Sequence, residues 1–206
     1  STVLLLADAG RASAEPRVRE LLAAGRHVVA VDPFYFGESK IAGQPGLFAI
    51  LVAAVGERPL GIQAGQVAAV ARWLSRERGL GPVEIATEGP RTGLIGLVAA
   101  ALEPDAISGL VQRDAMASLR EVITGDLTVM QRPEQFCFGL LREFDLPQIK
   151  ALVAPRPGLA CSKCAVCGAG MASTTRSKPP WCQAWPSLST PCKDQRLGLR
   201  GSACSD

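Results

Sequence analysis

Hydrophobic residues follow two different periods along the first three quarters of the chain, and these periods predict alternating strands and helices. Continuous apolar runs have the length of buried parallel strands at residues 1–6, 27–31, 83–87 and 106–111. Apolar stripes or blocks typical of helices lie at residues 16–24, 47–55, 62–78, 92–102, 134–143 and 146–153. Ser118 and Glu121 have the spacing of a capping box, which predicts a further short helix. Strand, helix and strand within about thirty residues form a βαβ unit, so we predict a parallel sheet and an α/β fold.

The stretch at residues 82–102 combines a short strand, a glycine-bounded turn and a helix of small apolar residues. The turn at residues 89–93, here called the elbow, reads Gly-Pro-Arg-Thr-Gly. It fits the spacing Gly-x-nucleophile-x-Gly, which holds a nucleophile above the sheet of an α/β-hydrolase. The nucleophile position holds Arg91, whose guanidinium stays protonated and has no lone pair to attack an acyl carbon. The elbow therefore has the glycine spacing of a catalytic turn but lacks the nucleophile.

Two further segments point to the same kind of protein. Residues 32–39 read Asp-Pro-Phe-Tyr-Phe-Gly-Glu-Ser and resemble the Asp-Pro-Arg-Gly-Phe-Gly-Glu-Ser loop that follows the fourth strand of many α/β-hydrolases. The elbow follows about fifty residues later, as in that fold. Residues 144–147 and 154–157 resemble the segment before the seventh strand of esterases similar to acetyl xylan esterases and dienelactone hydrolases. Over residues 1–157 the chain thus resembles this family, which implies hydrolysis of acyl esters such as acetylated sugars.

The resemblance implies a Ser-His-Asp triad, and each member can be sought in the sequence. Arg91 stands in place of the serine. The acid and the histidine would follow the seventh and eighth strands, whereas the resemblance ends at residue 157. The single histidine, His27, opens a strand and is expected at the amino-terminal edge of the sheet, opposite the elbow. We therefore assign no catalytic residue and predict a degenerate or truncated hydrolase that is inactive.

Three other residues occupy positions at which such hydrolases place functional groups. Asp8 and Gly10 lie in the turn that supplies one oxyanion-hole amide. A carboxylate there would repel a developing oxyanion, so we expect a structural turn unless Asp8 pairs with Arg11 or Arg91. Asp114 follows a strand where some hydrolases keep an acid, but it lacks a histidine partner and is interpreted as a loop aspartate.

The elbow itself allows a second interpretation, in which it binds instead of cleaving. Arg91 at a helix N-terminus could clamp a carboxylate or phosphate, although a solvated arginine, or one in an ion pair for which Glu88 is a candidate, is the simpler expectation. Thr92 is expected to cap the helix, and Gly93 closes the turn. A nucleotide-binding Rossmann-type protein is a third hypothesis, but the elbow glycines do not match Gly-x-Gly-x-x-Gly.

Composition changes sharply near residue 157. Residues 1–160 carry 16 basic and 17 acidic side chains with one cysteine, whereas residues 161–206 carry 6 basic, 2 acidic and six cysteines. We interpret residues 1–157 as a truncated hydrolase-like domain and residues 158–206 as a low-order, disordered tail rich in Cys, Ser and Pro. One hypothesis is that this tail is translated outside the family's reading frame.

Cysteines and bulk charge add little to this picture. Cys161, Cys164 and Cys167 have metal-like spacing, but the fourth ligand is unmatched and no histidine follows, so we predict no metal and no cofactor. A net charge of +3 is too small to argue for nucleic acid or an anionic membrane.

The expected partners are a small ester or anionic ligand, and a second copy through an exposed sheet edge. The sequence assigns no compartment, and we expect the start of the gene to lie upstream of Ser1.

Overall fold

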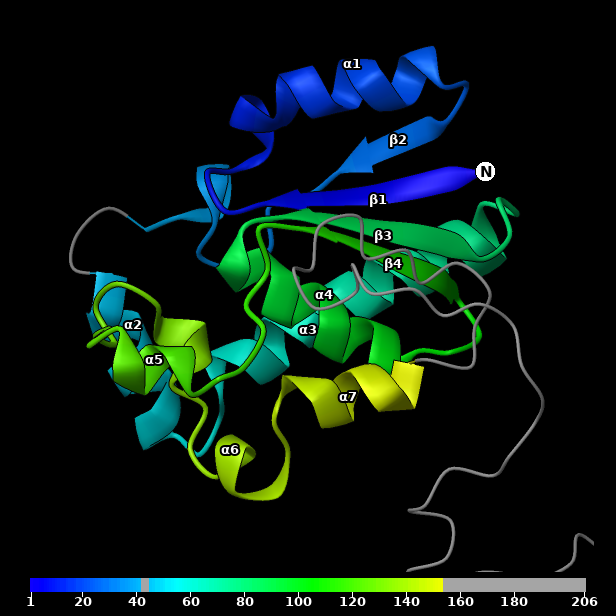
Figure 1. Ribbon diagram of the computed structural model, residues 1–206. Helices are drawn as coiled ribbons and strands as arrows, with labels where there is room; N and C mark the ends of the chain where they lie inside the picture. The colour runs from blue at the N-terminus through cyan, green and yellow to red at the C-terminus, as the bar shows by residue number, and fades with distance from the viewer. Residues whose placement is uncertain (42–44, 154–206) are drawn as a thin grey trace, which may run out of the picture. The chain divides into compact units, whose positions relative to one another are not determined.

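The computed structural model describes residues 1–41 and 45–153, which form a parallel four-stranded sheet with helices on both faces (Figure 1). The strands are β1 (Thr2–Ala7), β2 (His27–Ala30), β3 (Val83–Glu88) and β4 (Ile107–Arg113). Their order in the sheet is β2-β1-β3-β4, and Leu4 of β1 pairs with Val29 on one side and Ile85 on the other. The predicted α/β class and parallel sheet are confirmed. Residues 154–157, which resemble the segment before a seventh strand, lie outside the described residues, as do the predicted domain boundary and the tail.

Seven α-helices are described, and most of them match the predicted segments. They are α1 (Glu15–Ala23), α2 (Pro45–Ala54), α3 (Pro59–Arg72), α4 (Pro90–Leu102), α5 (Glu121–Thr124), α6 (Leu140–Glu143) and α7 (Leu146–Val153). A π-helical turn, Trp73–Glu77, continues α3. At α5 the Glu121 carboxylate accepts the amide of Ser118 at 3.1 Å, so the capping interaction forms just ahead of the helix.

The single helix predicted at residues 134–143 is wrong. Its first part is a 3-10 turn, η4 (Pro133–Gln135), and its last part is the short helix α6. Gly139 separates them with a left-handed φ of +86°, a conformation that an α-helix cannot continue through. The change of direction places Glu134 and Gln135 in the interior, where a regular helix would have kept only one face buried.

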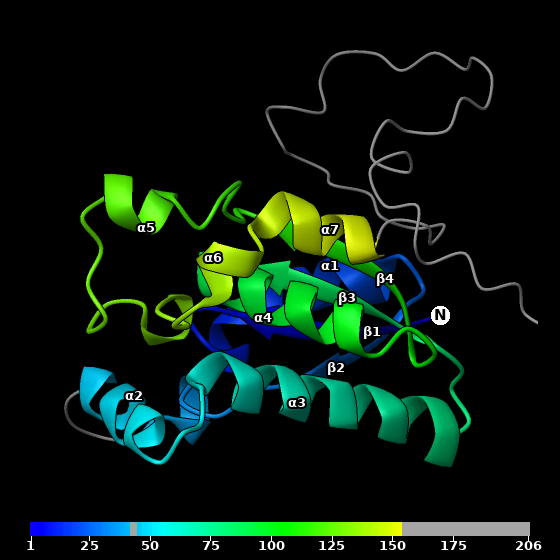
Figure 2. The same ribbon diagram turned by 90° about the horizontal axis from the view of Figure 1, so that it is seen from below.

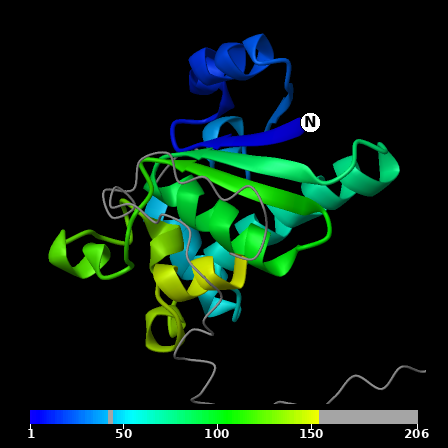
Figure 3. The same cartoon turned by 45° about the vertical axis from the view of Figure 1, so that its right-hand side comes forward.

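The two faces of the sheet carry different numbers of helices. Val3 and Leu5 of β1 point to the face covered by α1, while Leu4 and Leu6 point to the face covered by α3, α4 and α7. Figure 2 shows α4 between α3 and α7, and Figure 3 shows α1 by itself above the sheet. Because β1 is buried on both faces, it reads as a continuous apolar run without alternation.

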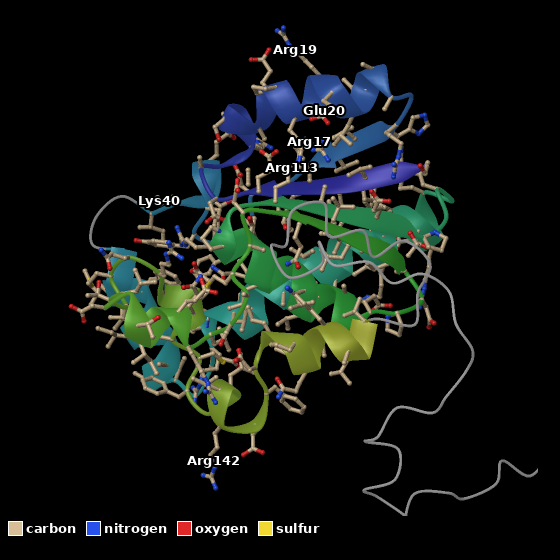
Figure 4. All side chains as sticks on the ribbon, in the orientation of Figure 1. Arg17, Arg19, Glu20, Lys40, Arg113 and Arg142 are labelled. Carbon is tan, nitrogen blue, oxygen red and sulfur yellow. The ribbon has the colours of Figure 1, made fainter. Side chains whose placement is uncertain are left out.

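Charged side chains also link helix α1 to β4, an edge strand of the sheet (Figure 4). Glu20 of α1 lies 2.9 Å from the Arg113 guanidinium at the end of β4 and 2.6 Å from that of Arg17. Hydrogen bonds from Arg113 and Arg17 lower the pKa of Glu20 to about 2. The side chains of Glu20 and Arg113 are exposed, and exposed ion pairs add little to the free energy of unfolding. The main effect of this ion pair is therefore to orient α1.

Helix α4 lies very close to the sheet because one of its residues has no side chain. A Cβ on Gly96 would lie 2.7 Å from Cγ2 of Thr87 and 3.2 Å from Cγ2 of Ile85, both on β3. A larger residue would push α4 away from the sheet. This close packing fixes where α4 begins, and therefore fixes the elbow.

The start of α7 is tied to the segment before α5 by one carboxylate. Asp145 Oδ1 accepts the amides of Leu119 and Leu146, each at 2.7 Å, and Oδ2 accepts the Ser118 hydroxyl at 2.5 Å. Burial alone would raise the pKa of Asp145, but these hydrogen bonds lower it more, so the pKa lies below its usual 3.8.

We expect Asp145→Asn to lower the unfolding free energy by about 1–2 kcal/mol at neutral pH, because charge-assisted hydrogen bonds are lost. The native pKa is depressed, so the carboxylate stabilises the fold above its unfolded pKa of 3.8, and this contribution is lost as the pH falls through the native pKa. Urea titrations from pH 7 to pH 3 should show wild type and variant converging at the acid end. A difference that stays constant with pH would contradict the assignment.

Among residues 1–41 and 45–153 no single helix is long and apolar enough to cross a bilayer, and one pair bent by 92°, Gly46–Ala54 with Pro59–Glu77, passes jointly by length and composition.

Candidate functional site

The elbow has the predicted strand–turn–helix geometry. Strand β3 ends at Glu88, Gly89 has φ +107°, and α4 begins at Pro90. A Cβ on Gly89 would lie 2.4 Å from Cγ of Asp8, so both the backbone conformation and the available space require glycine. Asp8 directly follows β1, the neighbouring strand, and so reaches the same edge of the sheet.

The Asp8 carboxylate occupies the amides at the start of α4. Its Oδ2 accepts the Arg91 amide at 3.0 Å, and its Oδ1 accepts the Thr92 amide at 2.7 Å. The Thr92 hydroxyl lies 2.7 Å from the same Oδ1. A helix N-terminus favours an anion, and here the protein supplies that anion from its own chain. Asp8 thus contacts Arg91, one of the two arginines considered as its partner, through the backbone amide and not through the guanidinium.

Three amides at positions where an oxyanion hole could form have acceptors within the protein. The residue after the nucleophile position is Thr92, and its amide is bound to Asp8. In the turn after β1, the amide of Asp8 donates to Glu88 O at 2.9 Å and that of Gly10 to Ala7 O at 3.0 Å. Gly10 has φ +90°, and a Cβ there would lie 2.7 Å from Cα of Gly37, so its role is close packing of two loops.

The Arg91 side chain is held by a buried ion pair. Its Nε and Nη2 donate to the two carboxylate oxygens of Glu134, the second at 3.1 Å, and its guanidinium lies 4.3 Å from the centre of the Phe36 ring. Glu134 is fully buried. The expected pairing with Glu88 is wrong, since Glu88 lies near Arg17 and Arg113 instead. Glu134 is 43 residues away along the chain, and no local pattern marks it as the partner.

Two more predicted residues have structural positions at the elbow. Thr92 was expected to cap α4, but Gly89 is the N-cap and Thr92 is the third helical residue, fully buried. A Cβ on Gly93 would lie 3.1 Å from Cβ of Ala115. The absence of a side chain at Gly93 therefore allows the loop after β4 to pack closely against α4. Asp114, in that loop, is exposed and has φ +54°.

A histidine base is distant from this arrangement. His27 opens β2 and is exposed. In a parallel sheet the first residues of strands lie at the edge opposite the elbow, which follows the last residue of β3. His27 therefore cannot accept a proton from a group at the elbow, as the sequence led us to expect.

An apolar pocket of about 330 Å³ lies next to the elbow between α2, the start of α3 and residues 129–138. Helix α2 contributes Ala49, Ile50 and Ala53, and the opposite wall includes Phe136 and Phe138. Pro133, which precedes the buried partner of Arg91, also lines it. Sequence reasoning missed this pocket, because its walls come from segments far apart in the chain.

Cys161, Cys164 and Cys167, whose spacing resembles that of metal ligands, lie outside the described residues. The described cysteine, Cys137, is half-buried and free. Burial raises the pKa of its thiol, so it is neutral at pH 7 and is a poor nucleophile or metal ligand.

Comparisons with known proteins agree with this geometry. No family model matches the chain, and no curated protein matches its sequence. The crystal structure of a candidate acetyl xylan esterase from Bacteroides fragilis NCTC 9343 is similar, with a TM-score of 0.60 and 16% sequence identity. The match covers 76% of this chain and 50% of that protein, so the chain spans about half its length. The predicted resemblance is confirmed at the level of fold: the chain shares the α/β fold of that crystal structure over the matched part.

Proposed function

We propose that this chain is a degenerate, partial α/β-hydrolase that does not cleave esters by the Ser-His-Asp mechanism. One observation carries the proposal: Asp8 binds the elbow amides that would otherwise stabilise a tetrahedral oxyanion. A fixed negative charge at that place opposes the charge that develops during acyl transfer. The half-length match to the Bacteroides protein supports a partial hydrolase.

The chemistry of the neighbouring side chains supports the same proposal. The nucleophile position carries a guanidinium that is bound to Glu134, and the hydroxyl of the next residue, Thr92, is buried and bonded to Asp8. The chain's one histidine is at the opposite sheet edge. Among the described residues, the elbow therefore has neither an activated hydroxyl nor a histidine base beside it for nucleophilic attack.

The hypothesis of an anionic ligand at the elbow is less favoured by this geometry. An incoming carboxylate or phosphate would have to displace Asp8, which the chain supplies at high local concentration. The Rossmann-type hypothesis is less favoured too, since the elbow follows β3 and not the first strand of the sheet.

A hydrolysis assay tests the proposal. We expect purified protein to release p-nitrophenol from p-nitrophenyl acetate no faster than buffer, and to remain unlabelled by a fluorophosphonate probe, because the described elbow presents no activated hydroxyl. An active esterase assayed in parallel shows that the reagents work. Turnover above buffer that Thr92→Ala or Arg91→Gln abolishes would overturn the proposal.

A further inference from the structure

The pocket beside α2 has apolar walls, and one cation lies at its rim. Arg58 lines the pocket together with residues of α2 and with Pro59, the first residue of α3. Its guanidinium lies 5.9 Å from the centre of the Phe138 ring, on the opposite wall. The side chain thus spans the edge of an otherwise apolar site.

The charge of Arg58 is not neutralised by the surrounding protein. Its Nη1 donates to the carbonyl oxygens of Glu57 at 2.9 Å and Gly56 at 3.5 Å, and these are neutral groups. Within residues 1–41 and 45–153 it forms no ion pair with a carboxylate. Burial raises the pKa of the Cys137 thiol, which is close enough to be influenced by Arg58, so this thiol supplies no negative charge at pH 7. Nine other arginines of the same region lie within 4.0 Å of a carboxylate oxygen and form ion pairs, so Arg58 differs from most of them.

The backbone adds positive potential at the same place. Arg58 is the N-cap residue of α3, and no side chain caps this helix. The N-terminus of a helix of 14 residues carries partial positive charge from its free amides. Arg58 and the helix end therefore both favour an anion at the rim of the pocket.

We propose that this pocket binds a small aliphatic monocarboxylate, with its hydrocarbon chain between α2 and Phe136 and its carboxylate on Arg58. The volume of about 330 Å³ is at the small end of ligand pockets and suits a medium-length chain. Burial of the hydrocarbon chain against the apolar walls favours binding, and the Arg58 guanidinium would donate a charge-assisted hydrogen bond to the carboxylate. This site is separate from the elbow, whose anion position Asp8 fills.

Calorimetric titration of the full chain with octanoate, octanol and acetate tests the proposal. Octanoate should bind saturably at one site per chain. Octanol should bind about tenfold more weakly, because it lacks the charge, and acetate should not saturate, because it lacks the chain. Equal binding of octanoate and octanol, or no saturable octanoate binding, would overturn the assignment.

Three variants separate the pocket from non-specific binding. Arg58→Gln should weaken octanoate about tenfold and leave octanol unchanged, while Ala53→Trp should block both by filling the pocket. Arg142→Gln is the matched charge control, since Arg142 is 87% exposed on α6 and points away from the fold (Figure 4). Circular dichroism shows that each variant is folded. Equal octanoate affinity in wild type and Arg58→Gln would refute the site.

Discussion

Arg91→Ala should lower the free energy of unfolding by about 3–5 kcal/mol, the largest loss expected for one side chain at the elbow. The substitution leaves the Glu134 carboxylate fully buried without its cation. It also removes the guanidinium that packs on Phe36. Urea unfolding at pH 7, followed by circular dichroism, measures the change.

A double variant distinguishes a buried charge from lost packing. Replacing both partners with apolar residues, Arg91→Met with Glu134→Leu, should recover most of the loss, because no charge is then left buried. Arg142→Gln, at an exposed ion pair, should change stability by less than about 0.5 kcal/mol. If Arg91→Ala were as mild as Arg142→Gln, the ion pair would not be a structural element of the elbow.

The second large effect is expected at Asp8. Asp8→Ala should lower the free energy of unfolding by about 2–3 kcal/mol, because the amides of Arg91 and Thr92 lose a charged acceptor at the start of α4. The buried Thr92 hydroxyl loses a partner as well. Thermal and urea unfolding of the variant and wild type measure the loss.

Asp105→Ala is the matched control for this substitution, since Asp105 is exposed in the loop before β4. It should change stability by less than about 0.5 kcal/mol. Asp8→Asn should lie between the two, because an amide oxygen still accepts hydrogen bonds but carries no charge. An Asp8→Ala variant as stable as wild type would show that the start of α4 does not depend on this carboxylate.

Local patterns predicted the elements that depend on neighbouring residues. The parallel strands were predicted from continuous apolar runs, and the elbow from the spacing of Gly89 and Gly93, because these features are encoded within a few positions. The helix over residues 134–143 was wrong because Pro133 and Gly139 changed the backbone direction more strongly than the apolar period favoured a helix.

The contents of the site could not be predicted in the same way. Glu134 and Arg91 are 43 residues apart, and Asp8 and Thr92 are 84 apart, so each contact depends on how the sheet brings distant segments together. The sequence indicated that the nucleophile was absent. It did not indicate that the elbow amides were already bound to a carboxylate of the same chain.

That internal carboxylate sets the order in which activity could be rebuilt by engineering or evolution. Arg91→Ser alone would place a hydroxyl next to the Asp8 carboxylate, which would still occupy the elbow amides and act as an internal inhibitor. Only after Asp8 is replaced by a neutral residue would a serine and a new base gain any advantage from the vacated amides. The first step toward a working hydrolase is therefore the replacement of Asp8, which lowers the stability of the fold. Stabilising substitutions elsewhere in the chain would have to precede it.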